Sequence, residues 1–82
     1  MEMLEVMKLL DAFIDGGNTS MEAANRLEVL IDDAFPDDDF LQEIVEILAC
    51  YRPEGGDFLF DSSQVQNHLV EARIYLRRKI SL

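Results

Sequence analysis

Residues 36–51 of the chain read Pro-Asp-Asp-Asp-Phe-Leu-Gln-Glu-Ile-Val-Glu-Ile-Leu-Ala-Cys-Tyr, and this stretch decides the predicted fold. Pro36 disfavours helical geometry at the preceding residue and therefore ends one helix. The three aspartates that follow can cap the free amide groups of a new helix and face the positive end of its dipole. Apolar residues then recur with helical spacing, which predicts a helix over about 38–51. Its expected buried face comprises Phe40, Leu41, Ile44, Val45, Ile47, Leu48 and Tyr51.

Two amphipathic helices are predicted before this stretch, over about 2–15 and 20–35. Gly16 and Gly17 supply the positive φ that a helix end favours, and residues 19–22, Thr-Ser-Met-Glu, resemble a capping box for the next helix. The expected inner residues of the first helix are Met3, Met7, Leu10 and Ile14, flanked by Val6 and Phe13. Those of the second are Ala24, Leu27, Leu30, Ile31, Ala34 and Phe35.

A last helix is predicted over about 62–80, where Asp61 and Gln64 form a second capping box. The turn-rich residues 54–57 and an extended segment, Phe58 to Phe60, lead into it, and that segment should pack on the bundle. The expected inner residues are Val65, Leu69, Ala72, Leu76 and Ile80. Because no segment alternates with the period of a strand, we predict one all-α domain, an antiparallel up-down-up-down four-helix bundle.

The composition limits the classes of partner. Seventeen acids against seven bases give a formal net charge of -10 in 82 residues, and such a field repels phosphate backbones and anionic lipids. We therefore expect no direct binding to nucleic acid or membrane. No apolar run approaches the roughly 20 residues of a membrane span, and the first residues lack the basic segment of a signal peptide, so we expect a cytoplasmic protein.

Candidates for catalysis or metal binding are weak. His68 is the only histidine and is expected at the edge of the core, and Cys50 is the only cysteine and is expected to be buried. Asp61-Ser62-Ser63 is explained as a helix cap, and it lacks the leucine and the location of the phosphopantetheine site of carrier proteins. The run of three aspartates does not fit a calcium loop. We therefore predict no metal, no cofactor and no enzymatic activity.

Acidic residues are concentrated in the middle of the chain. Residues 28–61 contain eleven acids and one base, Arg52, so this stretch alone carries a net charge of -10. Self-repulsion among so many carboxylates costs stability, which a basic partner would relieve. A protein with a positively charged groove, such as an enzyme that cleaves RNA, fits this requirement. On charge alone, the candidate contact residues are Asp37, Asp38, Asp39, Glu43 and Glu46.

Three segments carry a resemblance to a known family: Leu9 to Leu27, Ala49 to Asp61 and Glu71 to Leu76. The first is an early helix that enters a turn, the second begins with Ala-Cys-Tyr-Arg-Pro-Glu, and the third reads Glu-Ala-Arg-Ile-Tyr-Leu. In these segments the chain resembles the colicin D immunity family. These small cytosolic helical proteins protect bacteria from a toxin that cleaves transfer RNA. The resemblance implies binding to the nuclease domain of a cognate bacteriocin or contact-dependent toxin by mimicry of RNA charge. By position it implies contacts from Glu54, Asp57 and Asp61.

An alternative function is an acidic helical adaptor or regulatory subunit for an unrelated basic protein. Val29, Val70 and Ile74 lie away from the expected inner faces of their helices. Such residues can belong to an apolar partner groove or to the seam of a weak homodimer. Toxin inhibition and adaptor function differ in the surface they require, which is carboxylate in the first and apolar in the second.

Overall fold

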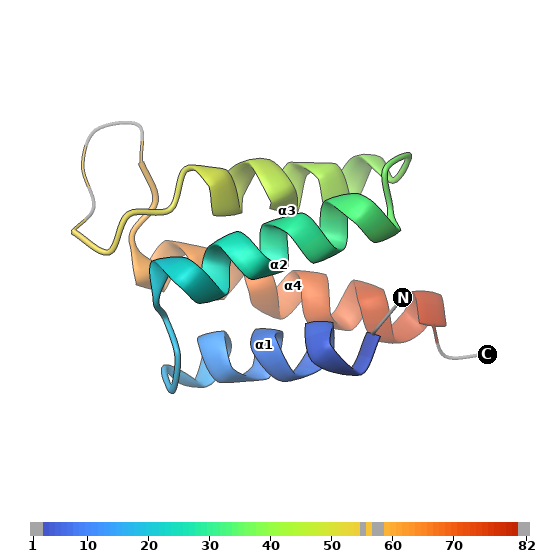
Figure 1. The fold of residues 1–82 in the computed structure, drawn as a ribbon, viewed down its shortest axis with the longest axis horizontal. Helices are drawn as coiled ribbons and strands as arrows, with labels where there is room; N and C mark the ends of the chain where they lie inside the picture. Colours follow the sequence, from blue (N-terminus) through green and yellow to red (C-terminus); the bar gives the residue numbers. More distant parts are fainter. Residues whose placement is uncertain (1–2, 55, 57–58, 81–82) are drawn as a thin grey trace.

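The computed structural model describes residues 3–54, 56 and 59–80, and this part of the chain folds into four helices (Figure 1). They are α1 (Met3–Asp15), α2 (Met21–Ala34), α3 (Asp39–Ala49) and α4 (Ser62–Ile80). The predicted all-α fold is confirmed, and α3 ends two residues earlier than expected. Within the described ranges, β-pairing is limited to one isolated parallel bridge between Tyr51 and Phe60.

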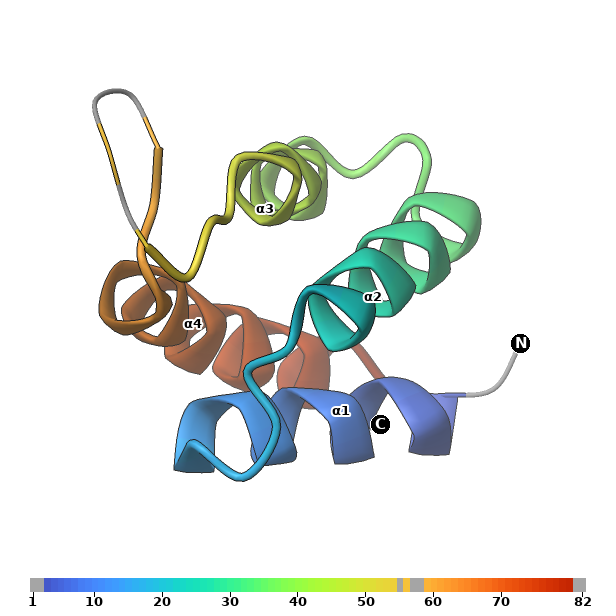
Figure 2. The same ribbon diagram turned by 60° about the vertical axis from the view of Figure 1, so that its left-hand side comes forward.

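Each helix packs against the next, and α4 also packs against α1, so the four helices surround one core. The chain turns back at each connection in Figure 1. Figure 2 shows α3 nearly end-on while α1 lies across the view, so these two helices cross at a large angle. The four-helix fold is thus established, whereas the regular up-down-up-down geometry stays a prediction.

The core draws on all four helices and on Tyr51, which follows α3. On α1 the fully buried residues are Val6, Leu10 and Phe13, whereas Met3, Met7 and Ile14 are only partly buried. The buried face of α1 is therefore centred on the residues predicted to flank it, because α1 must contact both α2 and α4. The buried side chains are Val6, Leu10, Phe13, Ala23, Ala24, Leu27, Ile31, Leu41, Ile44, Leu48, Tyr51, Val65, Leu69, Ala72 and Leu76.

The expected inner position of Ile80 is wrong, since 43% of this residue is exposed. The helix α4 has 19 residues, whereas its neighbours α1 and α3 have 13 and 11. Its last turn therefore extends beyond the part of the molecule that can cover it.

Helix caps follow the sequence closely, with one shift. Asp61 and Gln64 form the predicted capping box, each backbone amide donating to the other's side chain at 2.9 Å. At the start of α2, however, the cap is Ser20, whose Oγ accepts from the Ala23 amide at 3.1 Å. The capping box predicted at Thr19 is wrong, since the cap lies one residue later at Ser20. No reciprocal bond completes a box there, because the alanine side chain at position 23 has no hydrogen-bonding group.

Tyr51 fixes the end of α3 against the rest of the molecule. It is fully buried, its ring meets the edge of Phe13 with centroids 5.2 Å apart, and its hydroxyl donates to the Thr19 carbonyl at 2.6 Å. The Arg52 amide donates to the Phe60 carbonyl at 2.9 Å, which closes the base of the loop between α3 and α4. Phe60 packs against the core as predicted, whereas Phe58 lies outside the described residues.

Candidate protein-binding surface

Three carboxylates lie along the solvent side of α3. Asp39, Glu43 and Glu46 are spaced four and three residues apart and therefore fall within an arc of about 60° around the helix. The buried residues of α3, Leu41, Ile44 and Leu48, occupy the opposite side. We call the three carboxylates the acidic stripe; all are exposed, and none forms an ion pair with any described residue.

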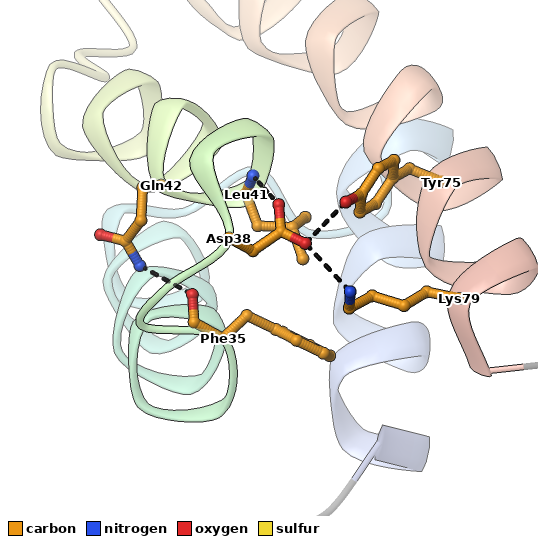
Figure 3. Close-up of polar contacts among 6 residues, drawn as sticks. All are labelled: Phe35, Asp38, Leu41, Gln42, Tyr75 and Lys79. Carbon is orange, nitrogen blue, oxygen red and sulfur yellow. Dashed lines mark hydrogen bonds and ion pairs between the residues drawn. The ribbon is translucent and has the colours of Figure 1, made fainter.

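Asp38 has a different environment from the acidic stripe, although it adjoins Asp39. Its side chain is only 10% exposed, and one carboxylate oxygen accepts from the Leu41 amide at 3.0 Å. The other accepts from the Tyr75 hydroxyl at 2.6 Å and lies 3.2 Å from Lys79 Nζ (Figure 3). Asp38 thus connects the start of α3 to the last turns of α4.

The titration of Asp38 reflects these contacts. Burial alone would raise the pKa of this carboxyl, but the hydrogen bonds from Tyr75 and Leu41 and the Lys79 ammonium outweigh burial, so the pKa lies below 3.8. The hydrogen bond to Asp38 also raises the pKa of Tyr75 above 10.0. Because its charge is already matched by internal donors, Asp38 is poorly suited to bind a partner.

The other predicted contact residues precede or follow α3 in the sequence. Asp37 is exposed in the turn before α3, and Glu54 is exposed in the connection after it. Asp61 is partly exposed and caps α4, whereas Asp57 lies outside the described residues. Of the predicted contact residues that the structure describes, Asp39, Glu43 and Glu46 lie together on α3, whereas Asp37, Glu54 and Asp61 lie in the connections before and after it.

Ion pairs neutralise acids elsewhere in the described residues. Arg26 on α2 contacts Glu5 on α1 at 2.9 Å, and its hydrogen bond lowers the pKa of that carboxyl. Arg73 on α4 contacts Asp11 on α1 at 2.8 Å. These pairs tie α1 to both of its neighbours. The basic residues that form ion pairs thus contact acids outside the acidic stripe, and the charges of the stripe are not compensated by them.

A shallow groove adjoins the acidic stripe. It is lined by Glu43, Glu46, Ile47, Cys50 and Phe60 and has a volume of about 360 Å³. The sequence predicts Ile47 and Cys50 to be buried, whereas both are partly exposed, and so is Phe60, which packs on the bundle as predicted. The spacing of Glu43, Glu46 and Cys50 indicates part of this groove, because residues three and four positions apart lie on one face of a helix.

Other candidate chemistry is weak in the part of the chain that the structure describes. His68 is partly exposed and forms a T-shaped ring contact with Phe60, with ring centroids 5.8 Å apart. Across residues 3–54, 56 and 59–80, no three side chains of His, Cys, Asp or Glu gather in a way that could hold a metal ion. None of the helices in those ranges is sufficiently long and apolar to span a bilayer.

The apolar alternative surface is not assembled in one place. Val29 on α2 and Ile74 on α4 are 57% and 49% exposed, while Val70 is partly buried. However, α2 and α4 lie diagonally across the core, and their backbones do not pack against each other within the described residues. The exposed side chains of Val29 and Ile74 therefore stand on two helices that are not packed directly against each other.

These features define a small acidic all-helical domain with an uncompensated row of carboxylates along one helix. Comparison of the chain with known protein families, with curated proteins and with solved structures finds no match.

Proposed function

We propose that the protein is an immunity-type inhibitor that binds the basic active site of a cognate nuclease toxin and blocks it with carboxylates. The observation that carries this proposal is the acidic stripe, Asp39, Glu43 and Glu46, exposed and without ion pairs among the described residues. Neighbouring positions three and four residues apart on a helix lie about 5–6 Å apart. The stripe therefore offers a regular series of negative charges, the feature by which a nuclease recognises a phosphate backbone.

The charge distribution also supports rapid capture. Residues 28–61 carry the whole formal net charge of -10, since the remaining 48 residues contain six acids and six bases. An asymmetric field of this kind steers a cationic partner and raises its association rate. Fast association matters for an inhibitor whose target is lethal to the cell until it is bound. The sequence resemblance to colicin D immunity proteins favours a tRNA-cleaving toxin as the target and the cytoplasm as the place of action.

Electrostatics of helix α2 point in the same direction. Asp32 and Asp33 lie close to the C-terminal end of α2, and the last turn of this helix contains no basic residue. Acids are unfavourable at this negative end of the helix dipole. Two exposed carboxylates at this position are better explained by the field they contribute than by the stability of α2.

The proposal is tested with the purified nuclease domain of a toxin encoded beside the gene for this protein. We expect an equimolar amount of the protein to block tRNA cleavage, with an association rate that falls as salt rises. The variant D39K/E43K/E46K should weaken inhibition at least about 100-fold, because it reverses the acidic stripe. The matched control D15K/E22K/E71K changes the net charge equally but alters exposed acids outside α3.

Three results would contradict parts of this proposal. Undiminished cleavage in the presence of the wild-type protein would overturn nuclease inhibition. Full inhibition by D39K/E43K/E46K would remove the acidic stripe from the contact surface. Equal losses in the stripe variant and the control would mean that net charge, and not this arrangement on α3, determines binding.

A further inference from the structure

The groove beside the acidic stripe combines two chemistries that are separate on the rest of α3. Ile47, Cys50 and Phe60 provide apolar and polarisable surface, while Glu43 and Glu46 provide two carboxylates. The two glutamates are three residues apart on one helix face and are both exposed. Phe60 is held in place by its backbone, since its amide donates to the Cys50 carbonyl at 3.1 Å and its carbonyl accepts from the Arg52 amide at 2.9 Å.

These residues select the chemistry of an occupant. An anionic group would be repelled by the two glutamates, and a purely apolar group would remove water from them without supplying a hydrogen bond. A long side chain with an apolar stem and a cationic head satisfies both requirements. Arginine fits better than lysine, because its planar guanidinium carries five donors that can bridge two carboxylates and can stack on an aromatic ring.

We propose that this groove is a specificity pocket for one arginine side chain of the partner protein, with the guanidinium bound between Glu43 and Glu46 and its stem against Ile47 and Phe60. This inference rests on the proposed function, because it takes the partner to be a basic protein. It adds a discriminating contact to the acidic stripe, which by itself would attract cationic proteins with little selectivity.

The pocket is tested with the peptide acetyl-Gly-Arg-Gly-amide as the probe, added to the ¹⁵N-labelled protein in NMR titrations. We expect saturable shifts centred on the amides of Glu46, Ile47, Cys50 and Phe60. The corresponding citrulline peptide, which keeps the shape but lacks the charge, should cause no saturable shift, and the lysine peptide should bind more weakly. The variant E43Q/E46Q should weaken binding of the arginine peptide at least about tenfold, whereas the matched control D32N/D33N should not.

Two results would overturn the pocket: equal shifts with the citrulline peptide, or unchanged arginine binding in E43Q/E46Q with its helical circular dichroism intact. Concentration-dependent dimers that disappear in R77Q/R78Q would show that a second copy occupies the groove, which is also contrary to the proposal. The nuclease assay separates the two levels of inference. Full inhibition by E43Q/E46Q would remove the pocket, and with it these two residues of the acidic stripe, from the contact surface while leaving nuclease inhibition in place. Arginine binding by a protein that does not inhibit the nuclease would instead leave the pocket in place and overturn the proposed function.

Discussion

At the scale of single residues, Asp38 differs from Asp37 and Asp39 although the three have the same chemistry. Their run after Pro36 predicts helix capping, and the bond from the Leu41 amide to Asp38 confirms it. The sequence does not indicate which of the three is buried. That choice depends on Tyr75 and Lys79, which lie 37 and 41 residues further along the chain and reach Asp38 only when α4 packs against α3.

We predict that Asp38→Ala lowers the free energy of unfolding by about 2 kcal/mol, because it removes a helix cap and a nearly buried, charge-assisted acceptor. The matched control Asp37→Ala should change it by less than about 0.5 kcal/mol, since Asp37 is exposed. Urea denaturation at pH 7 measures both. Equal losses in the two variants would contradict the structural role assigned to Asp38.

The contribution of Asp38 to the free energy of unfolding should also depend on pH. The folded state lowers the pKa of Asp38 below 3.8, so the ionised carboxylate stabilises the fold fully above that value. This contribution is lost as the pH falls through the folded pKa. The stability advantage of the wild type over Asp38→Asn should therefore be constant near neutral pH and shrink below about pH 4.

At the scale of elements, the connection between α1 and α2 depends on one glycine more than on its neighbour. Gly16 has a φ of +82°, which side-chain-bearing residues adopt at a cost, whereas Gly17 lies outside that region. We predict that Gly16→Ala destabilises the protein by about 1–2 kcal/mol. Gly17→Ala should be neutral or slightly stabilising, because its added Cβ would lie 3.7 Å from the Ala12 carbonyl oxygen in ordinary contact. Thermal unfolding of the two variants provides the comparison.

Helical periodicity and punctuation predicted the four helices nearly to their ends, because these signals are local. The errors arose where a neighbouring helix decides the outcome. The buried face of α1 is centred on Val6, Leu10 and Phe13 because α1 contacts two helices, and Ile80 is exposed because α4 extends past its neighbours. The groove beside α3 does not follow from the spacing of α3 alone, because Phe60 comes from the connection between α3 and α4.

At the scale of the whole molecule, the stability should respond to the uneven charge. Repulsion among the carboxylates of residues 28–61 is screened by salt, so we expect the melting temperature to rise between 10 mM and 300 mM NaCl. The variant D32K/D33K should be more stable than the wild type at low salt and less sensitive to salt, because lysine suits the C-terminal end of α2. A melting temperature that falls with added salt in the wild type would show that repulsion is not the dominant electrostatic effect.

The contact between α1 and α4 also determines when the fold can form during synthesis of the protein. Because α4 packs against both α1 and α3, a nascent chain that still lacks α4 leaves apolar faces of two helices uncovered and Asp38 without Tyr75 and Lys79. Such a chain is a substrate for chaperones and has no fixed support for its negatively charged helix. The packed fold should therefore form abruptly once α4 has left the ribosome, and not gradually as the preceding helices emerge.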